Sequence, residues 1–343
     1  MATHAVTRWL RHPIVWGSIS VALLALVAWR SRAWELGDRL GDADIRPILL
    51  AVGLDVVILL AWAARSSDLL TGAGRPVPVA PLVPMTAFAN TINNVTPGSV
   101  GELVRLYLLR AHHGVDYVTG AAVVVVERVV AIGLLAVSAA ILWGTWWLGI
   151  WPPLAVLALA VLALLPSLVY RIGLRPTALL RYLPLGAVIG RDRWAAAGRG
   201  LERVDAAVAR LLVDPRRALA FAAWTAVVFT CYTGQLLLVA AAIGRVIDPA
   251  AAWGALGLAI MAGVVSLLPF GLGSADLVLV GLLGVAGVPV AEAAAIAFGY
   301  RVVSTLPLGL TGVASYAFLS ARLPHGHMSE AASAARAALG EEG

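Results

Sequence analysis

The chain has 343 residues, of which 61% are hydrophobic and 13% are charged, with a formal net charge of +6 at pH 7. Soluble domains contain about 25% charged residues, so this composition excludes a soluble globular protein and indicates an integral membrane protein. The sequence has no lysine and one cysteine, Cys231. These counts exclude a P-loop ATP site, an internal disulfide and a metal centre built from several cysteines.

The first predicted element is an apolar helix at residues 14–29, which follows Arg8 and Arg11. It has no convincing signal-peptidase site, so we expect a retained helix with the N-terminus in the cytoplasm. Further apolar runs approach the length of about 20 residues that spans the hydrocarbon core. The predicted full spans are residues 14–29, 48–64, 118–143, 146–170, 218–243 and 291–319.

Two more apolar segments, residues 79–110 and 250–287, are interrupted by proline and glycine. Irregular backbone at membrane depth is tolerated only where protein or water covers it. Each segment therefore predicts a re-entrant helical hairpin beside a cavity. We expect the half-helices that begin at Ser99 and Gly273 to present free N–H groups to this cavity. The predicted break residues are Pro97, Gly98, Gly101, Pro269, Gly271 and Gly273.

The arginines predict the orientation. Residues 171–217 contain ten arginines and four acidic residues, so this linker should be cytoplasmic. Residues 65–75 should form a cytoplasmic turn, and the tryptophan-rich residues 143–151 a tight outer turn. Inside the linker, an apolar stripe predicts an amphipathic helix, either on the membrane surface or packed against the bundle. The stripe consists of Leu201, Val204, Val208 and Leu211.

The sequence also contains an internal repeat, which relates residues 94–128 to residues 266–301. Matched proline and glycine residues recur at a spacing of 172, and matched arginines recur at a spacing of 173. Duplicated broken helices are the best sequence indication of a transport site. The matched pairs include Pro97 with Pro269, Gly101 with Gly273, and Arg128 with Arg301.

The repeats cover about residues 46–143 and 218–319. Three predicted spans separate the two hairpins, so the hairpins should enter from opposite faces of the membrane. We therefore predict an all-α polytopic membrane protein with an inverted repeat, two re-entrant broken-helix hairpins and about six full transmembrane helices. It should form a single domain at residues 1–320, followed by a cytoplasmic tail at residues 321–343.

Charged residues inside the membrane are costly, which makes them candidates for a functional site. Arg128 and Arg301 each lie about ten residues into a helix, or about 15 Å deep. We hypothesise that they clamp one anionic group. Asp55 fits either a functional role or interhelical pairing. The predicted substrate-binding residues are Arg105, Arg128, Arg301, Glu102, Glu127, Asp276 and Asn94.

The segments PGSVGELVRLYLLR with ERVV, and LPFGLGSADLVLVGLLGVAGV with YRVV, resemble the lysylphosphatidylglycerol synthase transmembrane domain, also called the flippase-like UPF0104 family. The resemblance extends roughly from Trp16 to Leu319. It implies a multispanning inner-membrane protein that moves charged lipids between leaflets. Some members carry a soluble synthetase, which we do not expect here because only residues 320–343 follow.

We therefore predict a flippase that moves an anionic phospholipid or a polyprenyl-phosphate-linked lipid by alternating access around a midplane cavity. One alternative is an intramembrane lipid-modifying transferase with Glu127 or Asp276 as its base. The other is a small-solute transporter. Expected partners are the lipid bilayer, the anionic lipid and, as a candidate, a separate lipid-modifying enzyme. We expect no nucleic-acid partner, cofactor, metal site or catalytic residue.

Overall fold

The computed structural model describes residues 44–96, 100–150, 152–172, 191–266, 271 and 273–321. This part of the chain contains helices and no strand, which confirms the predicted all-α class. The helices are α4 (Ile45–Gly72), α5 (Val79–Val95), α6 (Val100–His113), α7 (Tyr117–Val125), the π-helical turn η3 (Val126–Val130), α8 (Ala131–Leu148), α9 (Pro152–Arg171), α12 (Arg191–Leu212), α13 (Pro215–Ala242), α14 (Pro249–Ser266), α15 (Ser274–Val285) and α16 (Val290–Ser320).

Five helical segments within these ranges are long and apolar enough to cross a membrane. A helix that spans the hydrocarbon core needs about 20 apolar residues, and its backbone polar groups are all paired within the helix. The predicted multi-pass membrane protein is therefore supported. The predicted span at residues 14–29 lies outside the described residues. The five segments are Ile45–Gly72, Tyr117–Leu148, Pro215–Ala242, Pro249–Ser266 and Val290–Ser320.

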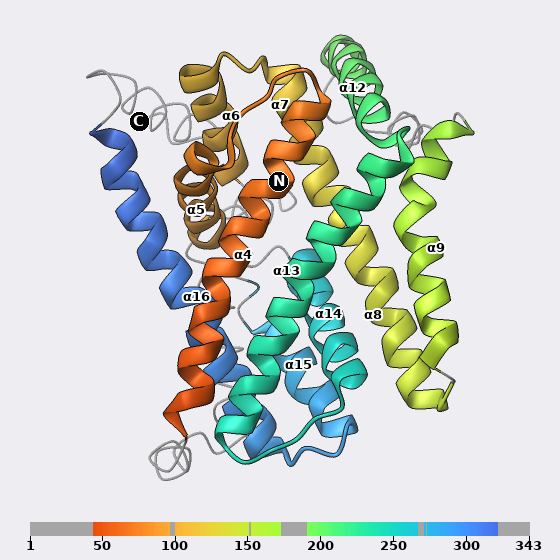
Figure 1. Ribbon diagram of the computed structural model, residues 1–343, viewed down its shortest axis with the longest axis vertical. Helices are drawn as coiled ribbons and strands as arrows, with labels where there is room; N and C mark the ends of the chain where they lie inside the picture. Colours follow the sequence, from red (N-terminus) through yellow and green to blue (C-terminus); the bar gives the residue numbers. More distant parts are fainter. Residues whose placement is uncertain are drawn as a thin grey trace, which may run out of the picture.

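Helices α4 and α13 form the centre of the bundle. Both have 28 residues, and each begins after an aspartate, Asp44 or Asp214, that accepts a hydrogen bond from a backbone N–H two residues later. Each is followed by a glycine with positive φ, Gly74 at 76° and Gly244 at 75°. The two helices run in opposite directions and lie side by side in Figure 1. Matched start and stop signals thus produce two matched helices.

Two helical pairs pack beside α4 and α13 (Figure 1). Helix α5 descends from the upper end of the bundle and α6 returns to it, whereas α14 rises from the lower end and α15 returns there. The predicted break residues Pro97, Gly98 and Pro269 lie outside the described residues. Gly271 and Gly273 have φ values of 58° and 84°, a conformation that glycine adopts without a steric penalty.

Gly101 lies in the first turn of α6, within the helix instead of within the break. A Cβ atom at this position would lie 2.0 Å from the carbonyl oxygen of Ala89 in α5. The glycine therefore allows the two arms of this helical pair to approach closely.

Each helical pair also packs against a long helix from the other half of the chain: α5 against α16, and α14 against α8. Small residues make both contacts. A Cβ at Gly312 of α16 would lie 1.9 Å from Thr91 Oγ1, and a Cβ at Gly257 of α14 would lie 2.5 Å from Ala139 Cβ. Small residues allow helix backbones to approach closely in membranes. The two halves therefore interlock.

Two predicted turns begin later than expected. Arg65 lies inside α4, which continues to Gly72, because no helix-breaking residue occurs between them. Likewise, α8 includes Trp147 and ends at Leu148, where Gly149 adopts φ of 62°. Long apolar helices therefore extend beyond the points where polarity alone suggested a turn.

The predicted amphipathic helix is part of α12. Val208 and Leu211 are each 1% exposed and belong to the same hydrophobic core as residues of α4 and α7. Of the two predicted placements, the structure has the helix packed against the bundle. Val204, Val208 and Leu211 of the apolar stripe pack on protein, where α12 contacts α7 and α9.

We expect Gly312→Ala to lower the unfolding temperature, because the new methyl group would collide with Thr91. Gly309 in the same helix is the matched control, since a Cβ there meets nothing within 4 Å. Gly309→Ala should keep or raise stability, by up to about 1 kcal/mol from helix propensity. The measurement is thermal unfolding in detergent, followed by dye labelling of the buried Cys231. Equal unfolding temperatures for the two variants would contradict the close α5 and α16 packing.

Candidate functional site

A cluster of four charged side chains lies between two short elements. Glu102 and Arg105 project from α6, and Glu127 and Arg128 project from η3. A π-helical turn widens a helix by one residue, and such turns occur frequently at functional sites. In this structure, the turn carries two adjacent charged residues within an otherwise apolar membrane helix.

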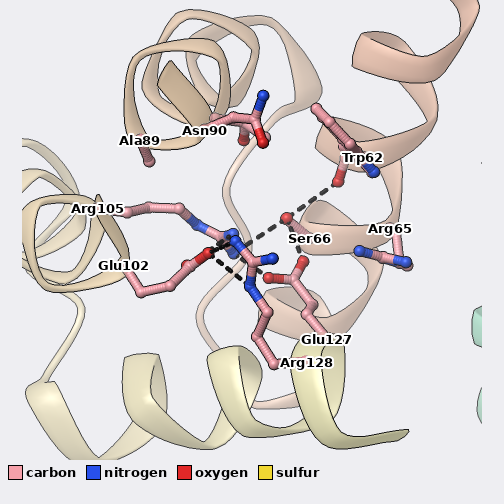
Figure 2. A pocket seen from close by; sticks show the side chains of 10 residues that line it. Trp62, Arg65, Ser66, Ala89, Asn90, Glu102, Arg105, Glu127 and Arg128 are labelled. Carbon is pink, nitrogen blue, oxygen red and sulfur yellow. Dashed lines mark hydrogen bonds and ion pairs between the residues drawn. The ribbon is translucent and has the colours of Figure 1, made fainter. Parts of the chain in front are cut away.

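Arg105 is the central cation of the cluster (Figure 2). Its Nη2 donates to the carboxylate of Glu127 and, over 3.2 Å, to Ser66 Oγ, while its Nη1 lies 3.5 Å from Glu102 Oε2. The last contact is an i,i+3 ion pair on one face of α6. Ser66 in turn donates to Glu127. The Arg105 and Glu127 side chains are 5% and 4% exposed, so these contacts replace the water that both charges have lost.

Arg128 is the accessible cation of the cluster. Its Nε donates to Glu102 Oε1 over 2.9 Å, and its side chain is 43% exposed, against 9% for Glu102. Asn93 Nδ2 donates to the same oxygen over 3.0 Å. The asparagine that contacts the cluster is therefore Asn93, one position before the predicted Asn94. One residue along a helix turns the side chain by about 100°, which is why the neighbour points elsewhere.

These side chains line a cavity between α4, α5, α6 and η3 (Figure 2). Its empty volume is about 430 Å³, with the open mouth included. Three arginines and two glutamates line it, which leaves one surplus positive charge when all five are ionised. The Nε atoms of Arg65 and Arg105 are buried without an acceptor. The lining residues are Trp62, Arg65, Ser66, Thr86, Ala89, Asn90, Glu102, Arg105, Glu127 and Arg128.

Arg65 is a cavity residue that the sequence reasoning missed. Its Nη1 donates to Thr225 Oγ1 of α13 over 3.3 Å, and its guanidinium lies 5.3 Å from the ring centroid of Phe221. Cation–π contact stabilises a buried guanidinium without neutralising it. The sequence contains a signal that Arg65 lies inside a helix, because Leu69 and Leu70 continue the apolar helical pattern beyond it.

The predicted residues Asp276 and Arg301 form a separate ion pair between α15 and α16. Arg301 Nε and Nη2 lie 2.9 and 2.8 Å from Asp276 Oδ1. The backbone N–H of Gly273 donates to Asp276 Oδ2 over 2.9 Å. The expected free N–H at Gly273 is therefore wrong, because the aspartate of the same helical turn accepts from it. Neither Asp276 nor Arg301 lines the cavity described above.

The titratable groups in the turn between α6 and α7 have pKa values that local contacts explain. The Thr119 backbone N–H, 2.9 Å from Asp116 Oδ1, holds the pKa of the Asp116 carboxyl below its usual range. Burial lowers the pKa of His112 and His113, in the last turn of α6. Within the described ranges, no three His, Cys, Asp or Glu residues lie close enough to hold a metal ion.

The fold and the cluster define a multi-pass membrane protein with charged side chains buried among its helices. Residues 14–312 match the family described as the lysylphosphatidylglycerol synthase TM region. The chain belongs to this family, as the sequence motifs predicted. It is also similar to a UPF0104 membrane protein of Methanothermobacter thermautotrophicus, with 31% identity over 125 residues. That alignment covers 34% of this chain and 35% of the relative, so the chain spans about a third of the relative's length.

We expect Arg105→Gln to destabilise the protein by about 3–5 kcal/mol, because it leaves Glu127 buried without its cation. The double variant Arg105→Gln with Glu127→Gln should recover part of this loss, since both charges are then absent. Unfolding in detergent of the two single variants and the double variant measures the coupling. Arg217→Gln is the control, because Arg217 pairs with Asp214 at the surface, where the two side chains are 46% and 44% exposed, and should matter little. Additive losses in the double variant would contradict the pair.

Proposed function

We propose that this protein moves an anionic lipid between the two leaflets of the inner membrane. The headgroup would enter the cavity while the acyl chains stay in the bilayer. The observation that carries this proposal is the surplus positive charge of the cavity. A charged side chain at membrane depth costs about 3 kcal/mol on insertion scales, and an anionic ligand would offset the unbalanced charge.

Arg128 and Arg65 are the groups we expect to contact the headgroup first. The Arg128 guanidinium is partly exposed, and a phosphate oxygen can replace Glu102 as one of its acceptors. Arg65 has a buried Nε without an acceptor and no carboxylate within ion-pair distance in the described part of the chain. Arg105 is held by two glutamates and would mainly keep the cavity positive.

The charge of the cavity also bears on the choice of lipid. A phosphodiester or polyprenyl phosphate headgroup is a net anion, which complements the surplus charge. Lysylphosphatidylglycerol has two ammonium groups and one phosphate, so its headgroup is a net cation. The cavity therefore favours an unmodified anionic phospholipid or a polyprenyl-phosphate-linked lipid as the substrate.

We infer further that the two halves of the chain form an inverted repeat with two re-entrant hairpins. Three features support this. Helices α4 and α13 match in length and run in opposite directions, and the two helical pairs start from opposite ends (Figure 1). In each half, an acid on the second arm pairs with an arginine on the next helix: Glu102 with Arg128, and Asp276 with Arg301.

Alternating access follows from this arrangement. Rocking of one half against the other would open the cavity to each face in turn. The phosphate would pass from the pair of Glu102 and Arg128 to the pair of Asp276 and Arg301. Both arginines would thus act on the same lipid, in sequence.

Topology provides the first test. In a Cys231→Ala background, a cysteine in place of Asp116 should react with a membrane-impermeant reagent from the cytoplasm, and one in place of Asp248 from the outside. The reason is that the two turns lie at opposite ends of the bundle (Figure 1). Labelling of both from the same side would contradict the inverted arrangement.

Lipid transfer provides the second test. We expect Arg128→Gln and Arg301→Gln each to reduce transfer of fluorescent phosphatidylglycerol in liposomes about tenfold or more, because a charge-assisted hydrogen bond contributes about 1.5–3 kcal/mol. The double variant should lose little more, since the lipid must pass both sites. Dithionite quenching measures transfer. Mass spectrometry checks that the lipid is chemically unchanged, because a transferase would modify it.

Arg245→Gln removes an arginine from an ion pair outside the cavity and is the matched control, with transfer expected at the wild-type rate. Each variant is first shown to be folded in detergent. Wild-type transfer by folded Arg128→Gln would contradict the proposed role of the cavity.

A further inference from the structure

A second buried polar contact lies at the interface of α4 and α13, apart from the cavity. Asp55 of α4 is 4% exposed, and Gln235 of α13 is fully buried. Gln235 Nε2 donates to Asp55 Oδ1 over 2.8 Å and to the Ala51 carbonyl over 3.0 Å. This contact joins residues 180 positions apart and connects the two halves of the chain.

Two oxygens of this pair lack a hydrogen-bond donor. They are Asp55 Oδ2 and Gln235 Oε1, and both are enclosed by protein. An ionised carboxylate can only accept hydrogen bonds, so an ionised Asp55 satisfies neither oxygen. A neutral Asp55 carries an O–H on Oδ2 that can donate to Gln235 Oε1, because the Nε2 to Oδ1 bond already brings the two groups face to face. One proton would therefore satisfy both oxygens.

Within the described ranges, no arginine forms an ion pair with Asp55. Tyr232 on α13 and Tyr300 on α16 interact with it electrostatically, and the buried Cys231 thiol belongs to the apolar cluster that Tyr232 packs against. Helix α5, which also packs on α4, has no ionisable side chain. Helices α7 and α12 meet α4 in the hydrophobic core around Leu69, towards its other end.

The arginines of neighbouring elements are engaged elsewhere. Arg301 follows Tyr300 on α16 but pairs with Asp276. Arg65 lies ten residues further along α4, about 15 Å away, and contacts Thr225. Burying an ionised carboxylate without a cation costs several kcal/mol, and such groups take up a proton instead.

The interface of α4 and α13 contains two side-chain hydrogen bonds at equivalent positions of the two helices. Arg65 of α4 donates to Thr225 of α13, and Gln235 of α13 donates to Asp55 of α4. Gln235 follows Arg65 by 170 positions, as Thr225 follows Asp55. One contact contains a permanent cation, and the other contains a carboxyl group that can gain or lose its charge. Neither is an ion pair.

We infer that Asp55 and Gln235 form a proton-binding site, that Asp55 is protonated in this conformation, and that this site couples lipid movement to a proton gradient. The coupling rests on the proposed lipid transfer, whereas the protonation does not. With the proton bound, two hydrogen bonds join the Asp55 and Gln235 side chains. Release of the proton to water leaves a carboxylate, which is stable only if the two halves separate enough for water to reach it.

Stability tests the protonation without any transport assay. Asp55→Asn replaces the acid O–H by an amide N–H, so the same two hydrogen bonds to Gln235 remain. We expect its unfolding temperature at pH 7 to equal or exceed that of wild type. Asp276→Asn is the matched control and should lose stability, because the Asp276 carboxyl group accepts from Arg301 and from the Gly273 N–H. An equal loss in both variants would overturn the protonation of Asp55.

Infrared difference spectroscopy is the second readout. The spectrum of wild type minus Asp55→Asn at pH 7 should contain the carbonyl stretch of a buried carboxylic acid. A carboxylate band in its place would overturn the inference, whatever the transport results.

The coupling is tested in liposomes that contain fluorescent phosphatidylglycerol and an internal pH indicator. We expect a pH gradient to accelerate lipid transfer by wild type, with proton movement, and to have no effect on Asp55→Asn. Equal acceleration of both proteins would overturn the coupling through Asp55. If a sodium gradient at constant pH accelerates lipid transfer, the coupling ion is sodium and the proposed proton coupling is overturned.

The outcomes separate the two proposals. If neither gradient changes the rate of lipid transfer by wild type, the coupling is overturned and the proposed function is left intact. Absence of any wild-type transfer would overturn the proposed function and the coupling together, while the infrared band would still decide the protonation of Asp55.

Discussion

The energetic cost of burying charge is the constraint on which this structure depends. Inside the bundle, each ionised side chain must find an opposite charge or a set of hydrogen-bond donors, because water is largely absent. Arg105 meets this requirement with Glu127, Glu102 and Ser66, and Arg301 meets it with Asp276. The cavity meets it incompletely, since three arginines face two glutamates there. This imbalance is why an anionic ligand is the natural complement of the site.

The same constraint applies to the interface of α4 and α13, where buried polar groups must find partners. Small and apolar residues on the neighbouring helices let the halves interlock, as at Gly312 and Gly257. At this interface, polar side chains form hydrogen bonds between the two halves, from Arg65 to Thr225 and from Gln235 to Asp55. Hydrogen bonds across such an interface depend on its geometry, so movement of one half changes them. We propose that a proton bound by Asp55, or a lipid phosphate bound beside Arg65, biases that movement.

Membership of the lysylphosphatidylglycerol synthase TM family is consistent with a lipid substrate, but the cavity charge refines the expectation. The family description names a cationic lipid, whereas the described cavity has surplus positive charge. Function within a fold family is decided by the site and not by the fold. We propose that the site takes a net anion and that the pair of Asp55 and Gln235 lets a proton gradient drive its movement.

Local patterns in the sequence determined the membrane class, the long helices, the two broken segments and the family, because hydrophobic run length and helix-breaking residues act over a few positions. They also identified Glu102, Arg105, Glu127 and Arg128, since charge in an apolar run stands out. Only the tertiary structure decided which groups meet. It placed Arg65 in the cavity, Asn93 and not Asn94 beside Glu102, and Gln235 against Asp55. Such contacts depend on helix rotation and crossing, which no short stretch of sequence contains.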